Sequence, residues 1–100
     1  MTQRVLHVFA SDHPTAAGHF PDNPIIPGAA ILREIVQAVS SATGLSVSAI
    51  PSVKFLQPVR PGDAIAIAWT LRPDGAVRFD CVVGGSGATV VTGALRMGLP

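Results

Sequence analysis

Cysteine, aromatic residues and charged residues are all scarce in this 100-residue chain. The single cysteine, Cys81, cannot form an internal disulfide or a Cys-x-x-Cys site, so we expect a reducing, cytoplasmic compartment. No run of apolar residues approaches the ~20 that a membrane-spanning helix needs. No N-terminal stretch has the pattern of a signal peptide either. The sequence therefore predicts neither a membrane span nor export.

Positive charge is too sparse and too scattered for nucleic-acid binding. Seven Lys and Arg residues face six Asp and Glu residues, which leaves a formal net charge of +1, and the cations never form a basic stripe. The three histidines lack the spacing of metal ligands, so we expect no metal site.

Apolar residues are abundant by comparison. They make up 48% of the chain against 13% for charged residues. A single domain spanning residues 1–100 is expected from the length. Because a body of this size leaves apolar surface in water, the composition predicts a homodimer or an assembly of dimers.

Hydrophobic periodicity predicts one strand, then one helix, then several strands. Residues 4–10 alternate weakly and predict a strand buried on both faces. Residues 11–27 are rich in Pro, Gly and Asp and predict a loop. From Gly28 to Thr43 apolar residues recur at helical spacing over a wide arc, so this helix should be largely enclosed, and Gly44 is a natural stop.

The remainder of the chain predicts an antiparallel meander. Its turns are Pro73-Asp74-Gly75 and the glycine-rich residues 84–87, and its strands are expected over residues 53–59, 64–71, 77–83 and 89–97. Strands and one helix in this order indicate the α+β class, with a sheet wrapped around a central helix.

A proline-rich loop runs directly into the predicted helix and carries a histidine. Prolines at 21, 24 and 27 restrict the backbone around His19. Gly28 permits close approach of a ligand, and the first N–H groups of a helix have no intrahelical partner. His19 can accept a proton near neutral pH, since an unperturbed imidazole has a pKa of ~6.5, and the N–H groups of Gly28 and Ala29 can stabilise an oxyanion.

Two stretches of the sequence resemble one known family, the β-hydroxyacyl-acyl-carrier-protein dehydratases. Residues 18–28, GHFPDNPIIPG, are similar to the family signature His-Phe-Pro-Gly-x-Pro-φ-φ-Pro-Gly, and a Gln follows at the expected distance as Gln37. Residues 53–63, VKFLQPVRPGD, are similar to a second strand-and-turn motif of the family. Two positions depart from the signature, because Asp22 replaces a glycine and Arg33 stands where the family has its acidic residue.

The resemblance implies the hot-dog fold and the dehydration of 3-hydroxyacyl thioesters to trans-2-enoyl thioesters, without a cofactor. It implies acyl carrier protein or coenzyme A thioesters as substrates, and a site shared between two subunits with the acyl chain in an apolar tunnel. It assigns catalysis to His19 and an acid, for which we choose Glu34, and substrate binding to Phe20, Pro27, Gly28, Ala29, Arg33 and Gln37.

The acid is the open question. A guanidinium stays protonated, so Arg33 cannot serve as a general acid. Arg33 and Gln37 share a helix face, and Glu34 is rotated by about 100°. Three alternatives remain open. Glu34 is the acid, or Asp22 or a water held by Gln37 takes the role of the acid, or the site has no acid. The structural interpretation of Glu34 is a solvated helix residue or one paired with an arginine.

Two other functions remain open at this point. One is a hot-dog acyl thioesterase, and the other is a non-catalytic subunit that binds acyl chains or pairs with an active partner, which Arg33 favours.

Five further residues have structural interpretations. We expect His7, Trp69 and Phe79 in the core, His13 in an exposed loop, and Arg60 as an exposed residue or as a rim charge facing an acidic carrier.

Overall fold

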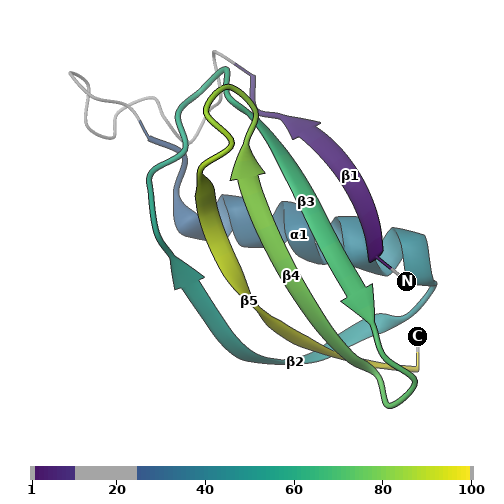
Figure 1. Ribbon diagram of the computed structural model, residues 1–100. Helices are drawn as coiled ribbons and strands as arrows, with labels where there is room; N and C mark the ends of the chain where they lie inside the picture. Colours follow the sequence, from purple (N-terminus) through teal and green to yellow (C-terminus); the bar gives the residue numbers. More distant parts are fainter. Residues whose placement is uncertain (1, 11–24, 100) are drawn as a thin grey trace.

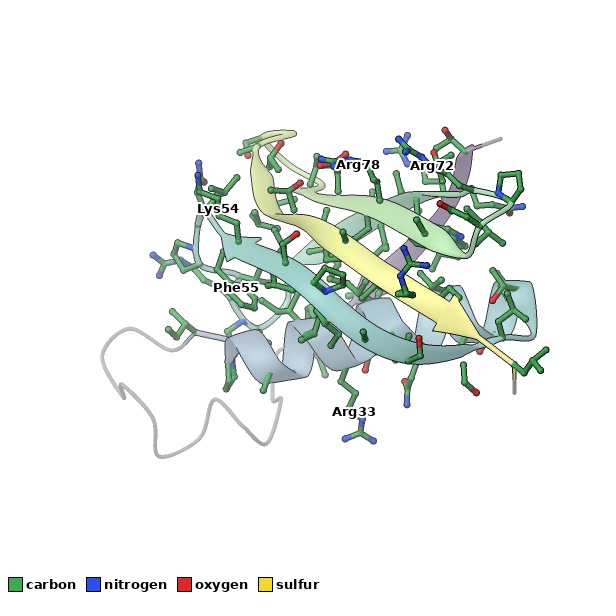
Figure 2. The ribbon with its side chains drawn as sticks, turned by 90° about the horizontal axis from the view of Figure 1, so that it is seen from below. Arg33, Lys54, Phe55, Arg72 and Arg78 are labelled. Carbon is green, nitrogen blue, oxygen red and sulfur yellow. The ribbon has the colours of Figure 1, made fainter. Side chains whose placement is uncertain are left out.

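The computed structural model describes residues 2–10 and 25–99 and consists of one sheet and one helix (Figure 1). The elements are β1 (Thr2–Val8), α1 (Gly28–Thr43), β2 (Ser46–Phe55), β3 (Ala64–Leu71), β4 (Ala76–Val83) and β5 (Thr89–Gly98). The sheet has the order β1-β3-β4-β5-β2, and every neighbouring pair is antiparallel. It curves around α1, which lies across one face (Figures 1 and 2). This confirms the predicted α+β layout.

Helix α1 has the predicted bounds because local signals mark both ends. Pro27 precedes its first residue with φ −58° and ψ 145°. Gly44 ends it in the left-handed conformation at φ 73°, and its N–H donates to the Ser40 carbonyl at 2.9 Å. The side chains facing the sheet are buried and repeat every four residues, as Ile31, Ile35 and Val39.

The expectation of a largely enclosed helix is wrong for the single chain. Ala29, Arg33 and Gln37 are exposed on the side of α1 that faces away from the sheet. A single sheet can cover only one side of a helix, and the described residues form no second layer that would cover the other side.

The large side chains of the central strands β3 and β4 lie in the core. Trp69 of β3 and Phe79 of β4 are paired in register and are 2% and 1% exposed, which confirms both as core residues. The predicted turns join these strands, with Gly75 at φ 88° and Gly87 at φ 72°. The core between sheet and helix thus consists of side chains from alternate strand positions.

Strand β1 corrects one expectation. Residues 4–10 were expected to form a strand buried on both faces, whereas β1 ends at Val8 and is mostly exposed, with Leu6 at 72% and Val8 at 63%. The reason is its position: β1 pairs only with β3, at the edge of the sheet, and no layer of the described chain covers its outer face.

Strand β2 also differs from the prediction, in its bounds. The strand expected over residues 53–59 begins at Ser46 and ends at Phe55. Pro51 lies in the middle of β2, which is the other edge of the sheet, where a missing N–H donor is tolerated. The register with β5 shifts on both sides of Ala49, as at a β-bulge.

Within the described part of the chain, no helix is long and apolar enough to cross a membrane.

Candidate functional site

The start of α1 carries backbone N–H groups that no other described residue accepts from. The N–H groups of Ala30 and Ile31 both donate to the Pro27 carbonyl, at 3.0 and 3.3 Å. Those of Gly28 and Ala29 have no acceptor among the described residues, and no side chain caps the helix. The first turn contains no acidic residue that could compete for them. Two N–H groups at the positive end of the helix dipole are therefore available to an oxyanion.

An apolar groove of about 390 Å³ lies beside this helix start. Phe55, at the end of β2, is 48% exposed and lies over the start of the helix (Figure 2). A Cβ atom on Gly28 would lie 2.9 Å from the Phe55 ring, so the glycine permits their contact. The groove is lined by Ile25, Ile26, Gly28, Ile31, Phe55, Leu56, Gln57, Pro58 and Val59.

Most of these lining residues were missed from the sequence. Four of them, residues 56–59, follow the end of β2, in a stretch that was expected to be part of a strand. Two backbone hydrogen bonds hold this stretch: the Ile26 N–H donates to the Val59 carbonyl at 2.6 Å, and the Leu56 N–H donates to the Val90 carbonyl at 2.7 Å. The motif over residues 53–63 was the available signal, since its prolines at 58 and 61 end a strand.

The exposed side of α1 brings together two of the predicted substrate-binding residues. Arg33 and Gln37 are both exposed, one helical turn apart, as their spacing predicted. Arg33 projects away from the sheet (Figure 2). Neither side chain lines the groove at the helix start.

Glu34 points elsewhere, toward the edge strand β1. Its Oε2 atom lies 3.4 Å from Nδ1 of His7, and the two side chains are 27% and 32% exposed. The His7 ring also meets the Phe9 ring edge to face, with centroids 4.6 Å apart. The expectation that His7 is a packed core residue is therefore wrong: β1 is an edge strand, so its inward side chain reaches the flank of the helix. Glu34 pairs with a histidine and not with an arginine.

Several predicted residues lie outside the described part of the chain, namely His13, His19, Phe20 and Asp22. Among the residues that the structure describes, no three His, Cys, Asp or Glu side chains gather as a metal site would require.

Comparison with protein families gives one match over most of the chain. The model described as ApeI-like, ApeI dehydratase, matches residues 2–94. Curated relatives include the 3-hydroxyacyl-[acyl-carrier-protein] dehydratase FabZ of Chlamydia trachomatis serovar L2, 36% identical over 67 residues, which are 56% of this chain and 44% of that protein. The FabZ of Anaplasma phagocytophilum is 34% identical over 84 residues, 70% of this chain and 58% of that protein. The chain thus spans about half the length of the curated relatives it matches.

Solved structures share the fold. An uncharacterized protein from Erwinia carotovora subsp. atroseptica has a TM-score of 0.84 and 21% identity, with 98% of this chain and 83% of that chain covered. The dehydratase heterocomplex ApeI:P from Xenorhabdus doucetiae has a TM-score of 0.80 and 22% identity, over 96% and 86%. The (R)-hydratase of A. caviae involved in PHA biosynthesis has a TM-score of 0.76 and 20% identity, over 100% and 95%. These likenesses establish the hot-dog fold.

Proposed function

Because the chain belongs to the ApeI-like dehydratase family, we propose that it dehydrates 3-hydroxyacyl thioesters to trans-2-enoyl thioesters. The observation that carries the proposal is the start of α1, where two N–H groups that have no acceptor in the described part of the chain lie beside an apolar groove. A thioester has a carbonyl that needs such donors and an acyl chain that needs such a groove. The FabZ relatives, named as dehydratases of carrier-bound 3-hydroxyacyl groups, support the same reaction.

Three groups divide the chemistry in this proposal. The N–H groups of Gly28 and Ala29 polarise the thioester carbonyl, which acidifies the C2 proton. His19 accepts that proton as general base. An acid protonates the hydroxide leaving C3, and the C2–C3 double bond forms. The elimination transfers no electrons to an acceptor, so the proposed reaction uses no redox cofactor.

We propose Glu34 as this acid and Phe20, Pro27, Arg33 and Gln37 as substrate contacts. Support for Glu34 comes from its partial exposure, which leaves its carboxylate reachable. Arg33 and Gln37 lie on the open side of α1 and can contact the polar arm of a thioester substrate.

A homodimer completes the proposed site. The open side of α1 needs a covering surface, and a second subunit would supply one together with its own His19. The proposed substrate is a thioester of acyl carrier protein or coenzyme A, and the proposed compartment is the cytoplasm.

A hydration assay with a crotonyl thioester tests the proposed function in the reverse direction. We expect hydration by the wild-type chain, and a loss on the order of 10²-fold or more in His19→Ala, the scale expected for a general base. Thioester cleavage without hydration would instead indicate a thioesterase. Full activity of His19→Ala would contradict the proposed base.

A second candidate is a subunit that needs a different partner chain for activity. The observation in its favour is Arg33 at the family's acid position, exposed on the open side of α1. The neighbour from Xenorhabdus doucetiae is itself described as a heterocomplex. Under this alternative the purified chain would lack hydration and cleavage activity alone and would gain hydration when mixed with a second hot-dog chain.

A further inference from the structure

The contact between His7 and Glu34 joins strand β1 to helix α1 through side chains. His7 belongs to β1 and Glu34 to the first half of α1, and their Nδ1 and Oε2 atoms lie 3.4 Å apart. Both side chains are about one-third exposed or less, so each is held by the protein and still reached by solvent. His7 is further oriented by the edge-to-face contact with Phe9.

Phe9 ties this arrangement to the connection between β2 and β3. Its N–H donates to the Asp63 carbonyl at 3.0 Å, and its carbonyl accepts from the Gly62 N–H at 2.8 Å. The imidazole is therefore positioned by three parts of the fold, namely β1, α1 and this connection.

The charges around His7 are simple. From α1 it faces Glu34, while Arg33 points to the open side of the helix. From β3 its register partner is Ile65, which is apolar. The charged residues of the β2–β3 connection are Arg60 and Asp63, and the Asp63 carboxylate accepts a hydrogen bond from the backbone N–H of Arg60 at 2.9 Å. Among the described residues, Glu34 is the one side chain within ion-pair distance of His7.

A carboxylic acid that protonates a departing hydroxide is left as a carboxylate and must regain a proton before the next turnover. In the described part of the chain, the proton-carrying group in contact with Glu34 is the imidazole of His7. Histidine side chains commonly serve as general acids and proton shuttles. The acid proposed for this chain thus has a source of protons within reach.

We propose that His7 is the residue that supplies Glu34 with its proton. This rests on the proposed dehydration. As the C3–O bond breaks, its electron pair leaves with the oxygen, which takes a proton from Glu34 and departs as water. Glu34 takes a proton from Nδ1 of His7, and solvent reprotonates the half-exposed imidazole. The C2 proton goes separately to the general base, and its electron pair forms the double bond. His7 acts through Glu34 and is a positioning residue, not one that touches substrate.

A double-mutant cycle on kcat tests this, with His7→Gln, Glu34→Gln and the double variant. The substrate is a 3-hydroxybutyryl N-acetylcysteamine thioester, assayed between pH 5 and 9. We expect His7→Gln to lower kcat at least ~10-fold with KM nearly unchanged, the lower end of a general-acid effect. The double variant should be no slower than Glu34→Gln, because His7 acts only through Glu34. The alkaline limb of the kcat profile should move to lower pH in His7→Gln. Wild-type kcat in His7→Gln, or losses that multiply, would overturn the proposal.

A matched control distinguishes the proposed role of His7 in proton supply from a purely structural role. Val5→Ala alters the preceding inward position of β1, which pairs with Ile67, and leaves the His7–Glu34 contact intact. It should lower thermal stability without moving the pH profile. An equal pH shift in Val5→Ala would overturn the proposal.

The contact itself is tested without turnover. The imidazole nitrogen shifts of His7, measured by NMR, should change in Glu34→Gln, and unchanged shifts would overturn the proposal. An active wild-type chain together with a His7→Gln variant that keeps the wild-type kcat would refute this inference alone. A wild-type chain that turns over no thioester would refute the proposed function, and this inference with it.

Discussion

Position 33 carries an arginine, which cannot serve as the acid of the proposed reaction. A guanidinium holds its proton at any working pH, and here it points away from the sheet on the open side of α1 (Figure 2). The neighbouring Glu34 lies on a different flank, against β1. Substitutions at these two adjacent residues therefore distinguish an enzyme with a displaced acid from a chain that has lost it.

We expect Arg33→Ala to keep turnover within about 10-fold of wild type and Glu34→Gln to lose on the order of 10²-fold, since only the carboxylate can pass on a proton. Steady-state kinetics with a 3-hydroxyacyl thioester measures both. The opposite pattern, with Glu34→Gln unaffected and Arg33→Glu more active than wild type, would show that the native site has no acid.

The buried environment of Cys81 leads to a prediction about the reactivity of its thiol. Burial, with a smaller contribution from Asp80, raises the pKa of its thiol from 9.0 to about 12. The native thiol should therefore resist a disulfide reagent at pH 8 and react only on unfolding.

Above pH 9 the thiol ionises in the unfolded chain but not in the native one, so the free energy of unfolding should fall as pH rises toward 12. This slope is at most about 1.4 kcal/mol per pH unit. A Cys81→Ala variant should lack this component, and native labelling at the rate of the unfolded chain would contradict the assignment.

At the scale of elements, Gly93 of β5 lies between the backbone of β2 and the ring of Phe79, with no space for a side chain. A methyl group on Gly93 would collide with the Ser52 carbonyl oxygen of β2 and would lie 2.8 Å from the Phe79 ring. Backbone on one side and a buried ring on the other leave no room for adjustment. We expect Gly93→Ala to lower the free energy of unfolding by about 1–3 kcal/mol, as in other overpacked cores. Urea denaturation measures it.

Gly28→Ala is the matched control, because the added methyl meets only the far end of the half-exposed Phe55 ring. That ring can turn aside, so stability should change little while substrate binding in the groove weakens. Equal destabilisation by the two substitutions would contradict this difference.

The elements that could be predicted are those whose limits are written locally. Helix α1 has Pro27 before it and Gly44 after it, and β3 alternates large and small side chains between two turn signals. The edge strands were misjudged because burial there depends on how many neighbours a strand has, which adjacent residues do not encode. The His7–Glu34 pair was missed for the same reason. It joins elements far apart in the sequence, and neither residue shows in its own surroundings that the other lies nearby.

The whole molecule, taken as one chain, leaves apolar side chains exposed at both edges of the sheet. On β1 these are Leu6 and Val8, at 72% and 63%. Ile50, Phe55 and Leu56 are 43%, 48% and 45% exposed. We expect the protein to form dimers, with twice the 10.3 kDa mass of the chain by light scattering at micromolar concentration. Ile50→Asp should shift this equilibrium toward monomer if β2 contributes to the interface. A monomer in the wild type would remove the shared-site scheme.

The strand order β1-β3-β4-β5-β2 also bears on how the chain reaches its native state. Only β3, β4 and β5 are joined by short turns, so this meander closes small loops and pays little chain entropy to form. The edge strands pair across long stretches of sequence and should join late. The central meander contains Trp69, the only tryptophan, whereas β1 contains His7 and β2 leads into the groove. During refolding, tryptophan fluorescence should therefore recover before turnover, because the site is assembled from the last elements to dock.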